Sequence, residues 1–482
     1  MRAARKNGVD VQNVEPETVL YTDGRWTRKM LRFDIFSEKT SFVLFLFRPI
    51  AYLPTMKEFI SVYLGQAGVQ LGAHVEEQHR REACVELDGI CSSASRSSLA
   101  AKSPSLDVFY SEEDGGRFRP RSIFADTETD IVDSIQTGPM RRMFHPDTII
   151  SRRRRADAPR GVFTGPTSNE QSDSLVQGIL RELRHQADTC DKTPSFNVYH
   201  GADGGTGSGV TAAVLSEVRS RYPKAELFTF SMYGGDSSFS CNPMAPYNEM
   251  LFTHAALENA HWTSVFSNDA LHRLCKTHLA VDRPSFNEMN EVASQVCASV
   301  HCRQAEDAVS SSSRELISTM IPYPRIHLIS HSWSPIHSEG HRKCFPPDSW
   351  YPSTMDITLA ALDPSAMVTS CNPRHGIQLG MTLLYRGQVG LEEAQTIVSS
   401  LKHPAMEAVD WWANVVRPHV HDIPMRMPRA GSCLGYYEKS VTTVMNTSAV
   451  ADVFLASATK FDKLFSRAIA HLHVPRRRSW RR

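Results

Sequence analysis

The stretch NVYHGADGGTGSGVTAAVLSEV, residues 197–218, decides the fold of this 482-residue chain. Five glycines fall within the nine positions from Gly201 to Gly209, between a β-like run and a helix-like run. Where a strand turns directly into a helix, the first backbone N–H groups of the helix are unpaired and carry partial positive charge. Glycines let an anion approach those groups closely. The stretch therefore predicts an anion site, with a tight turn that holds no ligand as the alternative.

The two familiar phosphate loops do not match this turn. A P-loop needs Gly-Lys followed by Ser or Thr, and the chain contains no Gly-Lys pair. The dinucleotide pattern GxGxxG, begun at Gly205, needs a third glycine where Val210 stands. This mismatch argues against a nicotinamide-dependent oxidoreductase. Thr206 and Ser208 add hydroxyl groups, which we expect to act as further donors to the anion.

Strand-like and helix-like runs alternate from residue 56 to about residue 300. FISVYL (59–64), SIFAD (122–126), SFNVYH (195–200) and TSVFSND (263–269) read as strands, with helical periodicity between them. Such alternation predicts an α/β fold with a doubly wound parallel sheet. After about residue 320, shorter strands with many prolines indicate a second domain.

Composition narrows the class of partner. The hydrophobic content of 41% and the charged content of 22% are ordinary for a globular protein. Lys plus Arg is 53 against 52 for Asp plus Glu, so no nucleic-acid partner is expected. Ten cysteines without a CxxC pair indicate a reduced, intracellular protein. Arg48 and Pro49 interrupt the most apolar run, 41–54, so no membrane span is expected.

Polar side chains follow several of the predicted strands. Gln66 opens the helix after the first strand, Asp126 and Glu128 follow SIFA, and Asn268 follows TSVFS. In open α/β sheets, ligands bind beyond the carboxyl ends of the strands. Taken singly, each residue is also explained as a helix cap or a surface acid. Taken together, they indicate a ligand site at this edge.

A helix that begins near Pro284 places Phe286 and Asn290 four residues apart, on one face. An aromatic ring followed by an amide is a plausible purine clamp, because the ring stacks and the amide reads the edge of the base. A core phenylalanine is the ordinary alternative. With the glycine turn, the pair favours a nucleotide site.

Several motifs then resemble one family. GGTGSG (204–209), GQAGVQLG (65–72), VDRPSFNEMN (281–290), IPYPRIH (321–327) and KFDKLFSRAIAHLHV (460–474) resemble tubulin sequences, specifically α chains, in family order. The resemblance covers about residues 56–474. It implies an N-terminal extension (1–55), a GTP-binding domain (56–285), a core helix with an intermediate domain (286–440), a C-terminal helical region (441–474) and a basic tail (475–482).

The resemblance also implies the ligands, GTP and Mg²⁺, and the role of each matching residue. Glu128 would face the magnesium, Asn268 and Asn290 would read guanine, and Phe286 would stack on it. A further contact is expected from Ser240, with Cys241 equally eligible. The expected phosphate contacts come from the two glycine-rich motifs and are Gln66, Gly201, Gly204, Gly205, Thr206 and Gly207.

Glu315 matches the position at which α chains carry an acid that acts across the subunit interface. The resemblance implies a heterodimer with a β-tubulin-like chain, assembly into microtubules of the cytoplasmic cytoskeleton, and a catalytic role for Glu315 on GTP held by the partner. The chain's own GTP would be structural. The alternative for SSSSREL is a solvated helix start at which Glu315 stabilises the helix dipole.

Several positions depart from the family pattern. Asp203 stands beside the expected phosphates, and Ala245 replaces a family Glu near the ribose. Arg152–Arg155 occupy a shortened loop, where they either restore affinity for phosphate or, the interpretation that we favour, form a solvated basic loop. The end HVPRRRSWRR replaces a further helix and an acidic tail, so Arg476–Arg482 are expected to pair with an acidic tail of another subunit. These departures favour a second hypothesis, a non-polymerising paralogue that caps or sequesters tubulin.

One histidine-rich stretch has spacing like that of a metal site, but we do not expect it to bind zinc. His327 belongs to the IPYPRIH motif, and the rest of the stretch fills a variable loop. The stretch comprises His327, His331, His337, His341 and Cys344.

Overall fold

The fold was described from a computed structural model. The chain divides into two units, Met1–Leu53 and Pro54–Arg482, and all described residues belong to the second. The expected extension 1–55 and the basic tail therefore lie outside the described residues. The structure describes residues 57–91, 105–113, 115–151, 170–235, 242, 244–309, 314–336, 352–401, 408–409, 416–422, 424–425, 432, 434–435 and 437–466.

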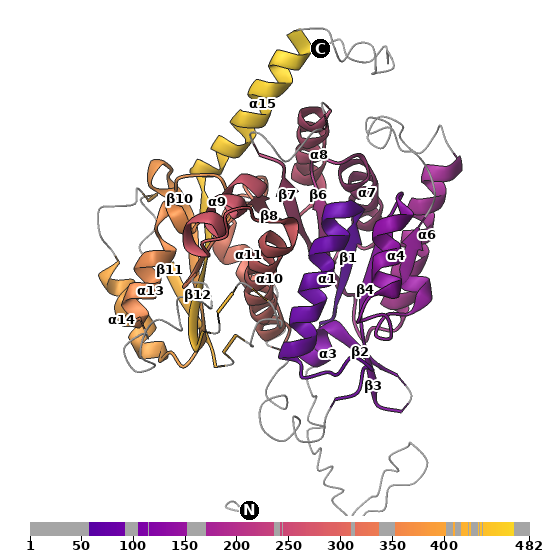
Figure 1. The fold of residues 1–482 in the computed structure, drawn as a ribbon, viewed down its shortest axis with the longest axis horizontal. Coiled ribbons are helices and arrows are strands. Elements are labelled where there is room, and N and C mark those ends of the chain that lie inside the picture. Colours follow the sequence, from indigo (N-terminus) through magenta and orange to yellow (C-terminus); the bar gives the residue numbers. More distant parts are fainter. Residues whose placement is uncertain are drawn as a thin grey trace, which may run out of the picture. The chain divides into compact units, whose positions relative to one another are not determined.

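Most strands of the described residues pair in one large sheet. The strands are β1 (Phe59–Leu64), β2 (Tyr110–Glu113), β3 (Arg117–Pro120), β4 (Ser122–Asp126), β5 (Ile149–Ser151), β6 (Ser195–Gly201), β7 (Leu227–Tyr233), β8 (Trp262–Ser267), β9 (Leu328–Ser334), β10 (Gln378–Gly387), β11 (Val416–His421) and β12 (Lys439–Thr447). Ten of them form the sheet, in the order β11-β10-β12-β9-β8-β7-β6-β1-β4-β5 (Figure 1). The other two, β2 and β3, form a separate antiparallel hairpin.

Helices connect the strands and cover both faces of the sheet. They are α1 (Gly65–Glu82), α3 (Ser105–Phe109), α4 (Thr129–Thr137), α6 (Glu170–Asp188), α7 (Thr211–Arg221), α8 (Ala245–Asn259), α9 (Asn268–His278), α10 (Phe286–Val309), α11 (Arg314–Met320), α13 (Thr354–Ala361), α14 (Leu391–Ser400) and α15 (Ala451–Ser466). A π-helical turn, Thr206–Val210, leads into α7, and short 3-10 turns occur at Pro146–Thr148, Pro364–Ala366, Pro373–His375 and Ser448–Val450. No helix within these described ranges is both long and apolar enough to cross a lipid bilayer.

Strand β1 shows why the sheet is covered on both sides. Its side chains alternate between two separate hydrophobic cores, because successive residues of a strand point to opposite faces. Phe59 and Tyr63 enter the core that contains residues of α1, α9 and α10, whereas Ile60, Val62 and Leu64 enter the core formed with α6, α7 and α8. All five side chains are almost fully buried. This arrangement confirms the expected doubly wound α/β fold.

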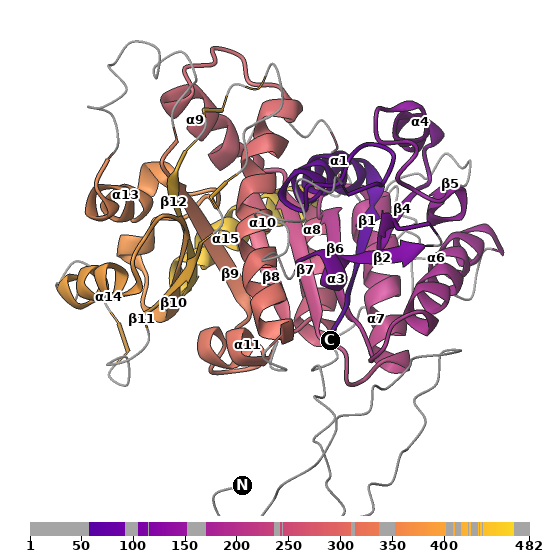
Figure 2. The same cartoon turned by 90° about the horizontal axis from the view of Figure 1, so that it is seen from below.

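The second half of the chain continues the same sheet. Strand β9 pairs in parallel with β8 through the register Thr263↔Leu328 and Ser264↔Ile329, and β12 then pairs antiparallel with both β9 and β10. Helix α10 packs on α1 and also contacts β9 and β10, so it lies between the two halves (Figure 2). The strands expected after residue 320 thus extend the sheet of the first half.

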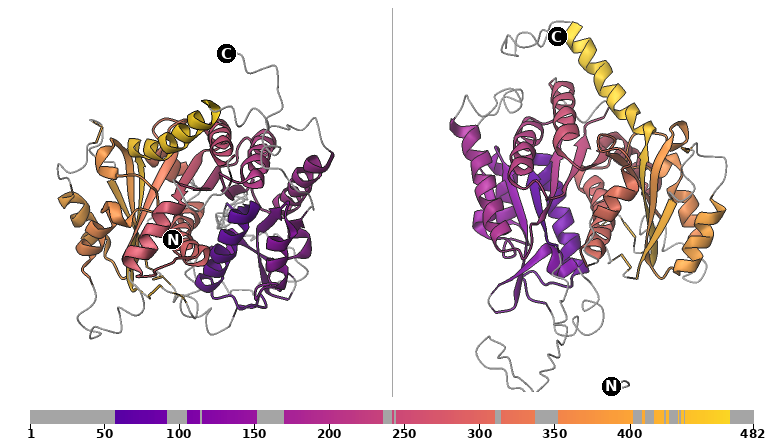
Figure 3. Two further views of the ribbon diagram at one scale, coloured as in Figure 1. Left: turned by 45° about the horizontal axis from the view of Figure 1, so that its top comes forward. Right: turned by 180° about the vertical axis from the view of Figure 1, so that it is seen from behind.

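The expected C-terminal helical region, 441–474, begins too early. Residues 441–447 belong to β12, where the β-branched and alternating run VTTVMNT favours a strand, and the helix α15 begins at Ala451. Helix α15 packs against α8 (Figure 3). The part of the region after residue 466 lies outside the described residues.

Candidate functional site

The predicted site residues follow neighbouring strands at one edge of the sheet. Strands β8, β7, β6, β1 and β4 are parallel and adjacent. Their registers pair Leu64 with Ala125 and with His200, and Tyr233 with Ser267, so their carboxyl ends meet at the same edge. The chain order reverses around β1, which is where ligands of doubly wound folds bind.

The glycine turn packs tightly against its own strand and against the start of α1. A Cβ atom on Gly207 would lie 2.3 Å from the carbonyl oxygen of Gly201. Gly65 has φ +71°, and a Cβ atom there would lie 2.9 Å from the backbone nitrogen of Gly207. By contrast, a Cβ atom on Gly204 would meet nothing within 4 Å. The turn therefore has a closely packed base and an open side at Gly204, through which an anion can reach the backbone.

The two hydroxyl groups of the turn have different roles. The Ser208 side chain is fully buried, and its Oγ donates to the carbonyl oxygen of Gly204 at 2.6 Å. Its backbone N–H donates to the same oxygen at 3.0 Å. The expectation that Ser208 would donate to a ligand is therefore wrong in this structure. Thr206 is only partly buried, and its Oγ1 lies 2.6 Å from Oγ1 of Thr127.

The Thr206–Thr127 contact brings the acids after β4 to the glycine turn. Asp126 is 2% exposed, and its Oδ1 accepts from the backbone N–H of Thr127 at 2.7 Å. Its Oδ2 has no hydrogen-bond partner, and burial raises the pKa of Asp126 to about 6. Glu128 is exposed at the start of α4. A buried carboxylate oxygen without a partner, beside a second carboxylate and hydroxyls, fits a cation.

Mg²⁺ suits this donor set. It binds oxygen ligands, and it usually takes one or two carboxylates together with phosphate oxygens and water. The described residues contain no group of three or more His, Cys, Asp or Glu side chains arranged to hold a metal. Asp126 and Glu128 would therefore hold Mg²⁺ jointly with an anion on the glycine turn. The sequence predicted Glu128 as the residue that faces magnesium. The buried Oδ2 atom of Asp126, which has no hydrogen-bond partner, makes Asp126 a second candidate ligand.

The predicted purine clamp lies at the start of α10. Ser285 and Glu288 hold this end of the helix, since the backbone N–H of Ser285 donates to Glu288 at 2.8 Å. Phe286, the first residue of α10, is 45% exposed, whereas Asn290 is 5% exposed. Asn268 is the first residue of α9, which packs on α10. An exposed ring with two amides on neighbouring helices suits a stacked base.

Asp203 is held through its backbone by two asparagine side chains. Its backbone oxygen accepts from Nδ2 of Asn248 at 2.9 Å and from Nδ2 of Asn242 at 3.3 Å. Its Oδ1 lies 3.2 Å from where a Cβ of Gly201 would be. Burial, together with the charge of Asp203, raises the pKa of Glu249 on α8. The carboxylate therefore lies beside the turn and close to a second acid.

The structure describes only some of the other positions that differ from the family pattern. Ala245 is the first residue of α8 and is buried. Arg152–Arg155, Ser240 and Cys241 lie outside the described residues, as do His337, His341 and Cys344. The remaining members of the histidine stretch, His327 and His331, are buried, and burial lowers the pKa of both.

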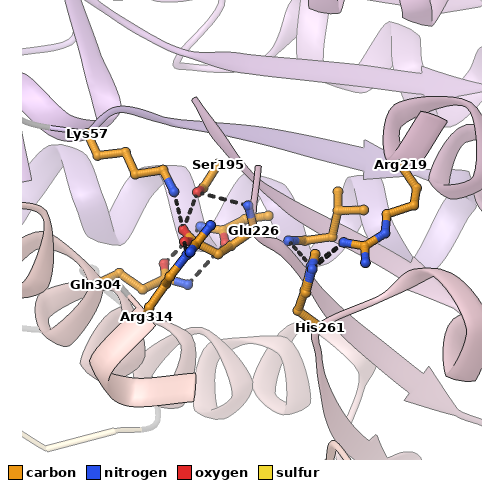
Figure 4. A network of polar contacts seen from close by, with 9 residues as sticks. Lys57, Ser195, Arg219, Glu226, His261, Gln304 and Arg314 are labelled. Atoms are coloured by element: carbon orange, nitrogen blue, oxygen red, sulfur yellow. Dashed lines mark hydrogen bonds and ion pairs between the residues drawn. The ribbon is translucent and has the colours of Figure 1, made fainter. Parts of the chain in front are cut away.

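Glu315 lies at the opposite edge of the sheet. Its neighbour Arg314 pairs with Glu226, which directly precedes β7 and so marks the amino end of that strand (Figure 4). The glycine turn follows the carboxyl end of β6, the parallel neighbour of β7. A strand of this length spans about 20 Å at about 3.3 Å per residue. Glu315 therefore cannot reach the chain's own glycine turn, and its side chain is 47% exposed.

The sheet edge, the glycine turn and the clamp on α10 define a doubly wound α/β protein of the nucleotide-binding class. Comparison with known sequences is more specific. Residues 58–276 match the model of the GTPase domain of the Tubulin/FtsZ family, and residues 324–458 match that of the tubulin C-terminal domain. The chain belongs to the tubulin family.

The similar curated proteins include α chains from distant organisms. The chain is 31% identical over 426 residues to the tubulin alpha-2 chain of Caenorhabditis elegans and to the tubulin alpha-1 chain of Arabidopsis thaliana, covering 87% of this chain and 91% of each relative. It is 31% identical over 427 residues to the tubulin alpha-1 chain of Schizosaccharomyces pombe, with the same coverage. The resemblance seen in the motifs is thus confirmed over most of the chain.

Proposed function

We propose that the chain is a GTP-binding structural subunit of microtubules that pairs with a β-tubulin chain. The observation that supports this most is the carboxyl edge of the sheet, where an open glycine turn follows β6 and a buried acid ends β4. The exposed ring of Phe286 begins α10, which packs on α9, the helix that follows β8. The backbone N–H groups of Gly204, Gly205 and Thr206 would hold the phosphates, with Gln66 at the start of α1 beside them. This arrangement uses the helix dipole at the turn to stabilise the negative charge.

The other predicted site residues would bind either the Mg²⁺ ion or the guanine base. Mg²⁺, when bound, neutralises charge between the phosphates, and Asp126 with Glu128 would hold it there. Phe286 would stack on guanine, while Asn268 and Asn290 would read its edge. Because burial of Asn290 leaves its amide few competing waters, a hydrogen bond from the base would be specific.

Glu315 would act on the partner's GTP. It lies at the amino edge of the sheet and is half exposed, so it can face a second subunit that is stacked on this edge. A carboxylate in that position orients the attacking water or accepts its proton. The GTP in the chain's own site would serve structure and would not be turned over.

The test is Glu315→Gln in the full chain, assembled with a β-tubulin chain. Gln keeps the shape and one acceptor but cannot take a proton, so we expect GTP hydrolysis per polymerised dimer to fall at least about tenfold. Nucleotide retained in this chain's own site, identified by chromatography after denaturation, should remain GTP. A variant with unchanged hydrolysis would refute the role of Glu315, and a chain without guanine nucleotide would refute the proposed site.

Asp203 and Ala245 favour a second candidate, a tubulin-like subunit that pairs without polymerising. A carboxylate beside the phosphates weakens binding by charge repulsion, and at about 4 Å this reaches about 4 kcal/mol for an effective dielectric of 20. Sedimentation of the chain with a β-tubulin chain separates the two candidates. Co-polymers support the first, whereas dimers that remain in the supernatant support the second.

A further inference from the structure

The carboxylate of Glu315 lies between two arginines from different parts of the chain. Nη2 of Arg303 is 3.9 Å from Oε2, and Nη1 of Arg417 is 3.8 Å from Oε1. The Arg303 side chain is only 10% exposed, whereas that of Arg417 is 50% exposed. Arg303 lies on α10 and Arg417 on β11. Each oxygen of the acid therefore faces its own guanidinium group, one mostly buried and one half exposed.

The backbone that carries Glu315 is also held in place. Arg314, the first residue of α11, pairs with Glu226 at 3.4 Å. Glu226 is 4% exposed, accepts from Oγ of Ser195 at 2.7 Å and pairs with Lys57 (Figure 4). Since Ser195 and Glu226 belong to the amino edge of the sheet, the start of α11 is joined to a rigid element.

The histidine near these two arginines, His419, adds no positive charge. His419 lies on β11, and burial, together with Arg303 and Arg417, lowers its pKa to about 4. It is therefore neutral near pH 7, and the two arginines are the cations that face Glu315 among the described residues. An exposed glutamate without such partners samples several rotamers, which costs precision at the reacting water.

We propose that Arg303 is a positioning residue for Glu315. It acts from the core helix α10 on Oε2 of Glu315, so that Oε1, whose partner Arg417 is half exposed, is the oxygen that would exchange this partner for the water at the partner subunit's phosphate. The inference rests on the proposed function, since it concerns the same acid and the same cross-subunit reaction. Arg303 touches neither the nucleotide nor the water, so its whole effect passes through Glu315.

The experiment compares Arg303→Gln, Glu315→Gln and the double variant in full chains co-assembled with a β-tubulin chain. We expect Arg303→Gln to lower GTP hydrolysis per polymerised dimer about tenfold. In the Glu315→Gln background, the same change should lower the rate no further, because the two residues act as one unit. Arg303→Lys restores a cation without the planar fork, so it should recover only part of the loss and remain several-fold slower than the parent.

Arg221→Gln is the matched control, because Arg221 makes its exposed ion pair with Glu217, at 3.1 Å, and not with Glu315. It should leave hydrolysis unchanged. The inference is overturned if Arg303→Gln hydrolyses GTP at the parent rate, or if it lowers the rate equally with and without Glu315. If Glu315→Gln itself is fully active, the proposed function fails first. If Arg303→Gln does not enter polymers, Arg303→Lys is used in its place. A several-fold loss of GTP hydrolysis that occurs when Glu315 is present and is absent in the Glu315→Gln variant supports the inference. No loss when Glu315 is present overturns it.

Discussion

Replacing Asp126 with Asn should stabilise the empty protein while weakening its binding of magnesium nucleotide. Asp126 is 2% exposed, and one of its carboxylate oxygens has no partner. Burial raises its pKa from the ordinary 3.8 to about 6, so near pH 7 the protein holds an ionised acid in a place that disfavours charge. An amide has the same shape without the charge. The hydrogen bond from the backbone N–H of Thr127 can be kept by the amide oxygen.

The magnitude follows from the pKa. The rise from 3.8 to about 6 corresponds to about 3 kcal/mol at about 1.4 kcal/mol for each pKa unit. Because the folded pKa is above the unfolded one, the folded state binds more protons between pH 4 and pH 6. The free energy of unfolding therefore falls as the pH rises through this range, and the full cost is present at pH 7. The Asn variant should lack this fall.

The assay is urea unfolding of the full chain after removal of nucleotide and metal, at pH 4.5 and pH 7. We expect Asp126→Asn to be more stable than the parent at pH 7, by up to about 3 kcal/mol, and by only about 1 kcal/mol near pH 4.5. A bound cation recovers the same cost, so the affinity for magnesium nucleotide should fall about a hundredfold. Asp130→Asn, at an exposed position on α4, is the control. A less stable Asn variant, or one with unchanged affinity, would refute the reasoning.

Two further substitutions test the packing around the site. Gly207→Ala places a Cβ atom 2.3 Å from the carbonyl oxygen of Gly201, so the free energy of unfolding in urea should fall by about 1–3 kcal/mol. Gly204→Ala faces open space and should change the free energy of unfolding by less than about 1 kcal/mol. Arg386→Met leaves Glu82, its partner at 2.8 Å, as a buried unpaired charge and should cost about 3–5 kcal/mol, much of which the double variant with Glu82→Gln should recover. A Gly204→Ala variant as unstable as Gly207→Ala, or a double variant no better than Arg386→Met, would contradict these accounts.

Local patterns were enough to predict the strands around the site. FISVYL and SIFAD coincide with β1 and β4, and the glycine turn lies between β6 and a helix as expected. Such patterns work because burial on both faces requires continuous apolar runs, and because the close approach of the turn after β6 to its own strand leaves no room for a Cβ atom. They also predicted that Gln66, Glu128 and Asn268 each follow a strand, and parallel strands align their carboxyl ends at one edge.

The side-chain contacts that set the role of several residues could not be predicted from local sequence patterns. Ser208 carries the same hydroxyl as Thr206, but its Oγ donates to the carbonyl oxygen of Gly204, four residues earlier, so it is not directed outward. Arg303 and Glu315 are close in sequence, but their pairing depends on the angle between α10 and α11. Glu226 meets Arg314 across 88 positions of sequence, a contact that no periodicity predicts. Tertiary packing decides the last two.

The two edges of one sheet carry the two halves of the proposed chemistry. The carboxyl edge holds the glycine turn and the acids for a cation, and the amino edge holds Glu315 with its arginines. Because a rigid, doubly covered sheet separates them, neither half can serve the other within one chain. A chain built in this way completes a reaction only when the amino edge of one subunit meets the carboxyl edge of the next. On the proposed function, hydrolysis is a property of the assembled polymer, and substitutions at Arg303 or Glu315 should leave nucleotide binding by the same chain intact.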